Sequence, residues 1–326
     1  MQHNKISEHS ITEQKEINGL PFPLVLQPTT EITLTETLLW ASENSSWLRE
    51  KLMLHGAILM RGLPLVTPMD FEVLIDRSGF PRMPYIGGAA PRNPVTNGRV
   101  LTTNESPPSE PIPFHHEMAQ VPNPPAYIFF YCQYPSESGG QTAIVHSHLV
   151  YKRFRAANSA FADKIEKTGV KYIRIMPDQD DRTSAIGRSW RSTFLTEDKS
   201  QAEVKMRELG TEWEWLADGN LKTITATVPA IRTDTRTGMK TFFNSVVAAY
   251  TGWVDSRNDP TKAVICGDGT AVDGEALLAT AAAMDEECVA FPWQKGDVLF
   301  IDNHLVMHSR RPFHGRREIL ATISPS

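Results

Sequence analysis

The chain is poor in cysteine, in long apolar runs and in positive charge. Its 326 residues include 3 Cys, with no C-x-x-C pair, so a disulfide framework is not expected and a reducing, cytoplasmic compartment is favoured. No run approaches the roughly 18 apolar residues of a membrane span, and the opening stretch MQHNKISEHSITEQKE lacks the apolar region of a secretory signal. The net charge of -5 argues against a nucleic-acid partner, which would require a basic face.

The composition that remains is that of a globular protein. Hydrophobic residues make up 40% and charged residues 22% of the chain. Residues 1–20 are polar and are expected to form a flexible N-terminal segment, whereas residues 21–326 show no long linker and are expected to form a single domain. The sequence leaves a homo-oligomer open.

Strand patterns lie in the middle and at the end of the chain, with helical patterns between them. The run 126–135 (AYIFFYCQYP) is dense in aromatic residues and predicts a strand, as do 57–62, 297–303 and 318–324. Helical spacing predicts one helix before the strand at 57–62 and another over 147–169, while 175–220 reads as irregular apart from a helix at 200–210. The fold class is therefore mainly β with helical insertions, a jelly roll flanked by α-helices.

The stretch PFHHEM, residues 113–118, places two histidines beside a carboxylate. In an extended backbone successive side chains alternate, so His115 and Glu117 would point one way and His116 the other. Such a pair can supply two of the three ligands of a 2-His-1-carboxylate iron site. Candidates for the third ligand are His304, His308 and His314. His304 and His308 are spaced as a helical zinc pair would be, but no H-E-x-x-H is present and the segment is a poor helix.

Two arginines precede the last predicted strand and could bind a carboxylate. Alternation places Arg317 on the same face as Ile319, Ala321 and Ile323, which is apolar, whereas Arg316 falls on the more polar face. An arginine on an inward apolar face is the better candidate for a two-bonded contact with a carboxylate. Arg317 is therefore preferred, with Arg316 as the alternative.

Several blocks of the sequence together resemble a known family. They are His55–Gly62, Phe114–Cys132 with Ser138–Val145, Phe242–Gly269, and Pro292–Phe313 with Ile319–Ile323. In this order they are similar to the Fe(II)/2-oxoglutarate-dependent oxygenases of the taurine dioxygenase superfamily, in the clavaminate-synthase-like branch. The resemblance extends from about residue 20 to the C-terminus, so residues 21–326 are expected to form one TauD-like domain.

The resemblance implies a double-stranded β-helix and a set of site residues. His115, Glu117 and His308 match the iron ligands, Thr142 matches a contact to 2-oxoglutarate, and Arg317 matches the arginine that binds its distal carboxylate. The expected reaction activates O2, oxidises a small-molecule substrate and releases succinate and CO2. Related halogenases lack the carboxylate at Glu117, so hydroxylation is favoured, with desaturation or cyclisation as alternatives. Relatives often carry an aromatic residue at His304, whose role stays open.

The substrate is less constrained than the reaction. Basic residues near the expected site hint at a carboxylate or an amino-acid derivative. Candidate substrate contacts are Asn104, Trp190, Arg191, Asn244 and Arg310. A cupin-like metal-dependent hydrolase or isomerase is an alternative, although it would not need a buried arginine for a co-substrate. A non-catalytic binding protein that keeps the fold is another, although it would be expected to have lost a metal ligand.

Overall fold

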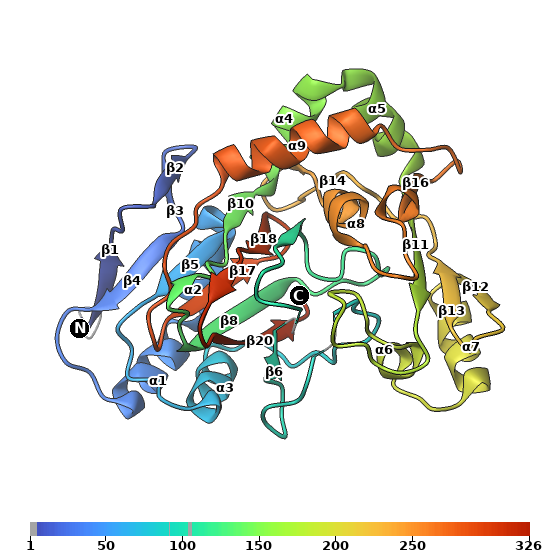
Figure 1. Cartoon of the computed structure of the whole chain (residues 1–326). Helices are drawn as coiled ribbons and strands as arrows, with labels where there is room; N and C mark the ends of the chain where they lie inside the picture. Colours follow the sequence, from blue (N-terminus) through green and yellow to red (C-terminus); the bar gives the residue numbers. More distant parts are fainter. Residues whose placement is uncertain (1–4, 91, 104–105) are drawn as a thin grey trace.

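The computed structural model describes residues 5–90, 92–103 and 106–326, and it combines several sheets with helices (Figure 1). The larger sheet is antiparallel except where β4 runs parallel to β5. In spatial order its strands are β1 (Ile6–His9), β4 (Leu24–Pro28), β5 (Ala57–Met60), β17 (Val298–Asp302), β8 (Tyr127–Tyr134), β20 (Glu318–Ser324) and β6 (Leu101–Thr102).

A smaller antiparallel sheet carries residues of the predicted metal site. Its strands are, in order, β10 (Ile144–His146), β18 (Val306–Arg310) and β7 (Ile112–His115). The register places His308 of β18 directly opposite His115 at the end of β7. Residues almost two hundred positions apart in the sequence are thus neighbours across one pair of strands.

The remaining strands form a third sheet and three short pairs. The third sheet has the order β12 (Glu212–Trp215), β13 (Leu221–Ile224), β11 (Val170–Met176) and β16 (Val264–Cys266). The pairs are β2 (Lys15–Ile17) with β3 (Leu20–Phe22), β9 (Ser138–Gly139) with β19 (Phe313–His314), and β14 (Arg232–Thr233) with β15 (Lys240–Thr241). Strand β12 of the third sheet lies within the segment 175–220, which the sequence indicated as irregular apart from one helix.

Helices cover two sides of the strands. They are α1 (Leu34–Glu43), α2 (Ser45–His55), α3 (Pro68–Arg77), α4 (Ser147–Ala157), α5 (Ser159–Thr168), α6 (Trp190–Phe194), α7 (Lys199–Glu208), α8 (Val246–Gly252) and α9 (Gly274–Glu287), with a 3-10 helix at Pro260–Lys262. In Figure 1, α1 and α3 lie under the larger sheet, whereas α4, α5 and α9 lie together at the top. No helix among the described residues is long and apolar enough to cross a membrane.

Two of the predicted helices are each divided in two by an asparagine. Asn44 separates α1 from α2, and Asn158, in an extended conformation with φ of -155°, separates α4 from α5. The side chain of Asn158 accepts a hydrogen bond from the Phe161 backbone N–H and so caps α5. Apolar spacing continues across both breaks, so periodicity alone predicted a single helix where local capping favours an interruption.

The described part of the N-terminal segment contains strands. Residues 1–20 were expected to be flexible; residues 1–4 lie outside the described residues, and in the rest β1 pairs with β4, and β2 pairs with β3. Ile6 and Ile17 are buried in the core. The polar composition did not reveal these strands, because β1 lies at the edge of the sheet and is held by backbone hydrogen bonds to β4, which do not depend on the side chains.

Alternation along the larger sheet creates two cores. Leu299 and Ile301 of β17 face the smaller sheet and pack in one cluster with Val306 of β18. Val298 and Phe300 face the other way and pack with side chains of α1, α2 and α3. The larger sheet is thus buried on both faces, and the smaller sheet covers one of them.

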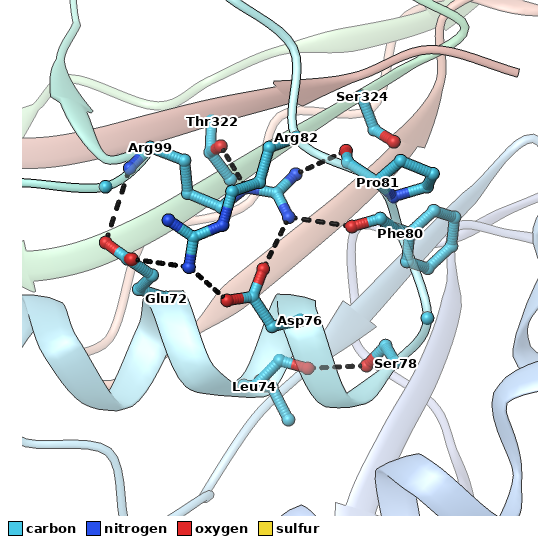
Figure 2. Close-up of polar contacts among 12 residues, drawn as sticks. Glu72, Leu74, Asp76, Ser78, Phe80, Pro81, Arg82, Arg99, Thr322 and Ser324 are labelled. Atoms are coloured by element: carbon cyan, nitrogen blue, oxygen red, sulfur yellow. Dashed lines mark hydrogen bonds and ion pairs between the residues drawn. The ribbon is translucent and has the colours of Figure 1, made fainter.

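Arg99 ties helix α3 and its following turn to the last strand (Figure 2). Its guanidinium donates to Thr322 Oγ1 at 2.8 Å, to Asp76 Oδ1 at 2.9 Å and to the Phe80 carbonyl at 2.8 Å. It also donates to the carbonyl of Ile323 at 3.1 Å. These contacts fix strand β20, which follows directly after Arg317.

Candidate metal centre

His115, Glu117 and His308 converge at one end of the smaller sheet. Their potential ligand atoms all lie within 4.8 Å of one another. His308 Nε2 is 3.6 Å from Glu117 Oε2, and the two imidazole rings are 4.3 Å apart between centroids. Two imidazoles and one carboxylate in this arrangement form the donor set of a facial iron(II) site.

The proton positions on His115 suit a metal ligand. Its Nδ1 lies 2.9 Å from the carbonyl oxygen of Pro113, which can only accept, so Nδ1 carries the proton and Nε2 keeps its lone pair. Burial, together with the neighbouring His308, lowers the pKa of His115 to about 4. The ring is therefore neutral at pH 7, as coordination requires.

His308 is held by packing. Its ring lies 5.1 Å from the Phe130 ring between centroids. Its Nδ1 is buried and has no hydrogen-bond partner among residues 5–90, 92–103 and 106–326. The nitrogen that faces the cluster is Nε2, which lies 3.6 Å from Glu117 Oε2 and is therefore the candidate ligand atom.

Glu117 is buried, yet its side chain is ionised. Burial alone would raise its pKa, but Arg92, His308 and His115 outweigh burial and hold the pKa well below its usual range. Arg92 NH2 lies 2.9 Å from Glu117 Oε2, and both side chains are almost fully buried. Sequence reasoning missed Arg92, because it lies in a Pro-, Gly- and Asn-rich loop without any periodic pattern.

His116 faces away from this cluster. Its Nδ1 lies 2.6 Å from the carbonyl oxygen of Asn303 and its Nε2 lies 2.9 Å from Ser147 Oγ, so both ring nitrogens have protein partners. The ring stacks on Phe243 with 4.5 Å between centroids. His116 is thus a buried structural histidine, on the opposite side of the chain from His115.

The side chain of Asn303 fixes the backbone of Glu117. Asn303 Oδ1 accepts from the Glu117 N–H at 2.8 Å, and its Nδ2 donates to the Glu117 carbonyl at 3.0 Å. A third bond runs from Nδ2 to the Pro125 carbonyl at 2.8 Å. The turn between β17 and β18 therefore positions the carboxylate that follows β7.

Thr142 and Arg317 lie together on the wall of the same cavity. Arg317 donates from NH2 to Thr142 Oγ1 at 3.4 Å and from Nε to the Gly140 carbonyl at 2.8 Å. Trp293 also donates to Thr142 Oγ1, at 3.2 Å. Burial, with some repulsion from Arg310, lowers the pKa of Arg317 to about 9, so it still carries its charge at pH 7.

Arg316 points to solvent, unlike the neighbouring Arg317. It is exposed, pairs with Glu318 at 2.9 Å and lies over the Tyr134 ring at 3.5 Å. The close approach of Arg317 depends on Gly140, which has φ of +71° and where a Cβ would lie 2.9 Å from Arg317 Cδ. Of the two arginines that the sequence offered, only Arg317 reaches the cavity.

The cavity has a volume of about 400 Å³. One part is polar and contains the three clustered ligand candidates with Thr142 and Arg317. The rest of the wall is largely apolar and includes Ile186, Ala248, Trp253 and Val254. Such a combination of a few convergent polar groups with apolar walls is typical of a small-molecule site.

Of the predicted substrate contacts within the described residues, Arg310 is the one that lines the cavity. Arg310 lines the cavity, but it donates to the carbonyls of Ser106, Pro107 and Glu110 and so holds that loop. Asn104 lies outside the described residues.

Three other candidates lie away from the cavity. Trp190 is buried and donates to Asp178 at 3.1 Å, and Arg191 pairs with Asp178 and with Glu197, at 2.8 Å each. Asn244 donates to the Ala230 carbonyl at 2.8 Å. Each of the three satisfies local packing or hydrogen bonding and none lines the cavity, so substrate contact at Trp190, Arg191 and Asn244 stays a prediction.

His304 belongs to a different part of the molecule. Its ring stacks on Phe243 with 5.8 Å between centroids, and it lines a second cavity with Arg232, Asp234 and Arg236. Burial lowers the pKa of His304, although the nearby Asp302 opposes the shift. His304 does not join the cluster of His115, Glu117 and His308, and His314 is exposed.

Comparison with known proteins identifies relatives over the whole chain. The sequence model of the family "Taurine catabolism dioxygenase TauD, TfdA family" matches residues 17–323. A "clavaminate synthase-like protein" of Arabidopsis thaliana is 45% identical over 325 residues, which cover 97% of each chain. The "dapdiamide synthesis protein DdaC" of Enterobacter agglomerans is 27% identical over 331 residues, which cover 97% of this chain and 95% of that protein.

Solved structures show a similar fold at low sequence identity. PvcB from Pseudomonas aeruginosa, described as an Fe, alpha-ketoglutarate dependent oxygenase, superimposes with a TM-score of 0.54 at 15% identity and covers 93% of this chain and 86% of its own. A taurine dioxygenase from Burkholderia xenovorans gives a TM-score of 0.53 at 13% identity and covers 99% and 90%. The architecture described above is thus that of these oxygenases.

Proposed function

Since the chain belongs to the taurine catabolism dioxygenase TauD, TfdA family, we propose that His115, Glu117 and His308 hold the iron of an Fe(II)/2-oxoglutarate-dependent dioxygenase. The observation that carries this assignment is the convergence of their ligand atoms within 4.8 Å. A neutral His115 and an ionised Glu117 add the protonation states that a divalent metal requires.

We further propose that Arg317 and Thr142 bind the distal carboxylate of 2-oxoglutarate. Arg317 is charged and half-buried, and its hydrogen bonds to Gly140 and Thr142 are to neutral oxygens, so an anion at this wall would be favourable. Bound iron(II) would supply the activation of O2, coupled to oxidative decarboxylation of 2-oxoglutarate to succinate and CO2. The chain itself orients the reactants and excludes water from the cavity.

The fold proposed for this site is a double-stranded β-helix. The larger sheet and the smaller sheet share one apolar core, and the candidate ligands lie at the end of the smaller sheet. Two antiparallel sheets that enclose a site between them support this description. The division into a single domain over residues 21–326 stays a prediction.

The substrate proposed is a small molecule, a carboxylate or an amino-acid derivative, and hydroxylation is the favoured outcome over desaturation or cyclisation. The retained carboxylate of Glu117 supports oxidation rather than halogenation. A cupin-like hydrolase or isomerase is disfavoured, because it would not need the cation of Arg317 on the cavity wall to bind a co-substrate carboxylate. A cytoplasmic location and a homo-oligomer stay predictions of the sequence.

Anaerobic addition of Fe(II) and then 2-oxoglutarate tests the assignment. We expect a visible charge-transfer band that requires both compounds in the wild type and is absent in His308→Ala. His304→Ala is the matched control, since His304 is a nearby histidine outside the ligand cluster, and it should keep the band. A folded, metal-loaded wild type without the band would refute the proposal, as would loss of the band in His304→Ala alone.

A further inference from the structure

Arg92 is a buried cation on the wall of the reaction cavity with unused hydrogen-bonding capacity. It lines the cavity together with Glu117 and Tyr85, and its side chain is 5% exposed. Its NH2 is bonded to Glu117 Oε2 at 2.9 Å. Its Nε and NH1 are buried and have no hydrogen-bond partner within the part of the chain that the structure describes.

Buried donors without partners are rare, because each loses its hydrogen bonds to water. The Tyr85 ring lies under the guanidinium, 4.5 Å from its carbon, and fixes its plane. The guanidinium has one edge formed by Nε and NH2 and another formed by NH1 and NH2. The hydrogen bond to Glu117 uses one N–H of NH2, which belongs to only one of these edges, so the other edge keeps two parallel N–H donors. Two parallel donors match the two oxygens of a carboxylate.

The charge balance of the loaded site leads to the same ligand class. With iron and 2-oxoglutarate in place, the charges of Fe(II) and Arg317 are balanced by Glu117 and the two carboxylates of 2-oxoglutarate. Arg310 faces the charge of Glu110 on the loop that it binds. Arg92 is then a desolvated positive charge in excess, and one further anion in the cavity would neutralise it.

We propose that Arg92 recognises a carboxylate group of the primary substrate, while its NH2 holds Glu117 in place. This inference rests on the proposed function and narrows its substrate class to an acid with an apolar body. The apolar part would lie against Ile186, Ala248 and Trp253 on the remaining wall. Because Arg92 contacts a proposed iron ligand directly, the oxidised carbon would lie near that carboxylate along the substrate.

Binding of matched acids and amides tests the role of Arg92. Anaerobic isothermal titration calorimetry would compare phenylacetate with phenylacetamide, and hexanoate with hexanamide, on protein saturated with Fe(II) and 2-oxoglutarate. We expect the wild type to bind the acids roughly 10- to 100-fold more tightly than the amides, as charge-assisted hydrogen bonds allow. Arg92→Gln should bring acid and amide close to equal affinity, while the control Arg77→Gln, at an exposed arginine of α3, should keep the preference.

The outcomes separate this inference from the proposed function. A wild type without the charge-transfer band would reject the proposed function itself. A wild type that forms the band but binds acids and amides equally would overturn only the role of Arg92, as would a preference that survives in Arg92→Gln. If Arg92→Gln is folded but no longer forms the band, the same comparison is made with Arg92→Lys, which keeps a cation beside Glu117 but lacks the pair of parallel donors; an acid preference as large as that of the wild type would then overturn recognition by Arg92.

Discussion

The amide of Asn303 is expected to be essential for the geometry of the metal site, and Asn303→Asp tests this with minimal change of shape. In the wild type the side chain accepts one hydrogen bond from Glu117 and donates two, to the carbonyls of Glu117 and Pro125. An aspartate keeps the acceptor but turns an oxygen toward both carbonyls. The variant therefore loses two hydrogen bonds, and the carbonyl oxygens of Glu117 and Pro125 both face a carboxylate oxygen of the new side chain instead of an N–H donor.

The magnitude follows from these contacts. Asn303 is fully buried, and each of the two buried carbonyls left without a partner costs about 1–3 kcal/mol, so we expect the free energy of unfolding to fall by about 2–6 kcal/mol. Asn303→Ala removes all three bonds but adds no repulsion, so it should be no less stable than Asn303→Asp. Fe(II) affinity should fall by roughly 10- to 100-fold in both variants, the usual effect of removing a group that orients a ligand.

Equilibrium urea unfolding of the metal-free protein would measure the stability, and anaerobic Fe(II) titration would measure the affinity. The control is Asn97→Asp, at an exposed asparagine, which should match the wild type in both assays. Wild-type stability together with wild-type Fe(II) affinity in Asn303→Asp would refute the reasoning.

Two further predictions concern charged groups. Arg317→Ala should weaken 2-oxoglutarate binding by roughly 3–5 kcal/mol, the cost of leaving one partner of a buried charge pair alone, whereas exposed Arg316→Ala should not; an effect of Arg316→Ala alone would reverse the assignment. Burial, together with His148, lowers the pKa of His146 to about 4, so as pH falls below about 6.5 the unfolded chain takes up a proton that folded His146 refuses. This group should remove about 2 kcal/mol of unfolding free energy between pH 7 and pH 5, and in urea unfolding His146→Gln should lose that share of the pH dependence; an unchanged pH dependence would contradict the prediction.

Period-two alternation predicted much of the site because the relevant segments are extended. His115 and Glu117 share a side, and Ile319, Ala321 and Ile323 all pack in the core between the two sheets. The strand pattern at 126–135 likewise corresponds to β8. In an extended segment the face on which a side chain lies follows from its position in the sequence, so these features could be predicted from the sequence.

The remaining features depend on contacts between distant segments. Arg92 lies in an irregular loop, and only the folded chain brings it to Glu117. Trp190 was a plausible substrate contact by residue type, but it packs edge-on against Trp215 in a small cluster of its own. An aromatic side chain in a charged segment gives no indication of which cavity, if any, it reaches.

Glu117 lies on the same side as His115, as alternation of side chains predicts, although strand β7 ends before Glu117. Strand β7 ends at His115, so Glu117 has no ladder partner on β18. The side-chain amide of Asn303 takes that place, since it bonds to both the N–H and the carbonyl of Glu117 as a peptide group of a neighbouring strand would. The carbonyl of Asn303 accepts from His116 at the same time. One residue of the β17–β18 turn thus extends the sheet by two positions, and the non-ligand His116 anchors that extension, so Asn303→Asp would disturb the metal site through its backbone rather than through its ligands.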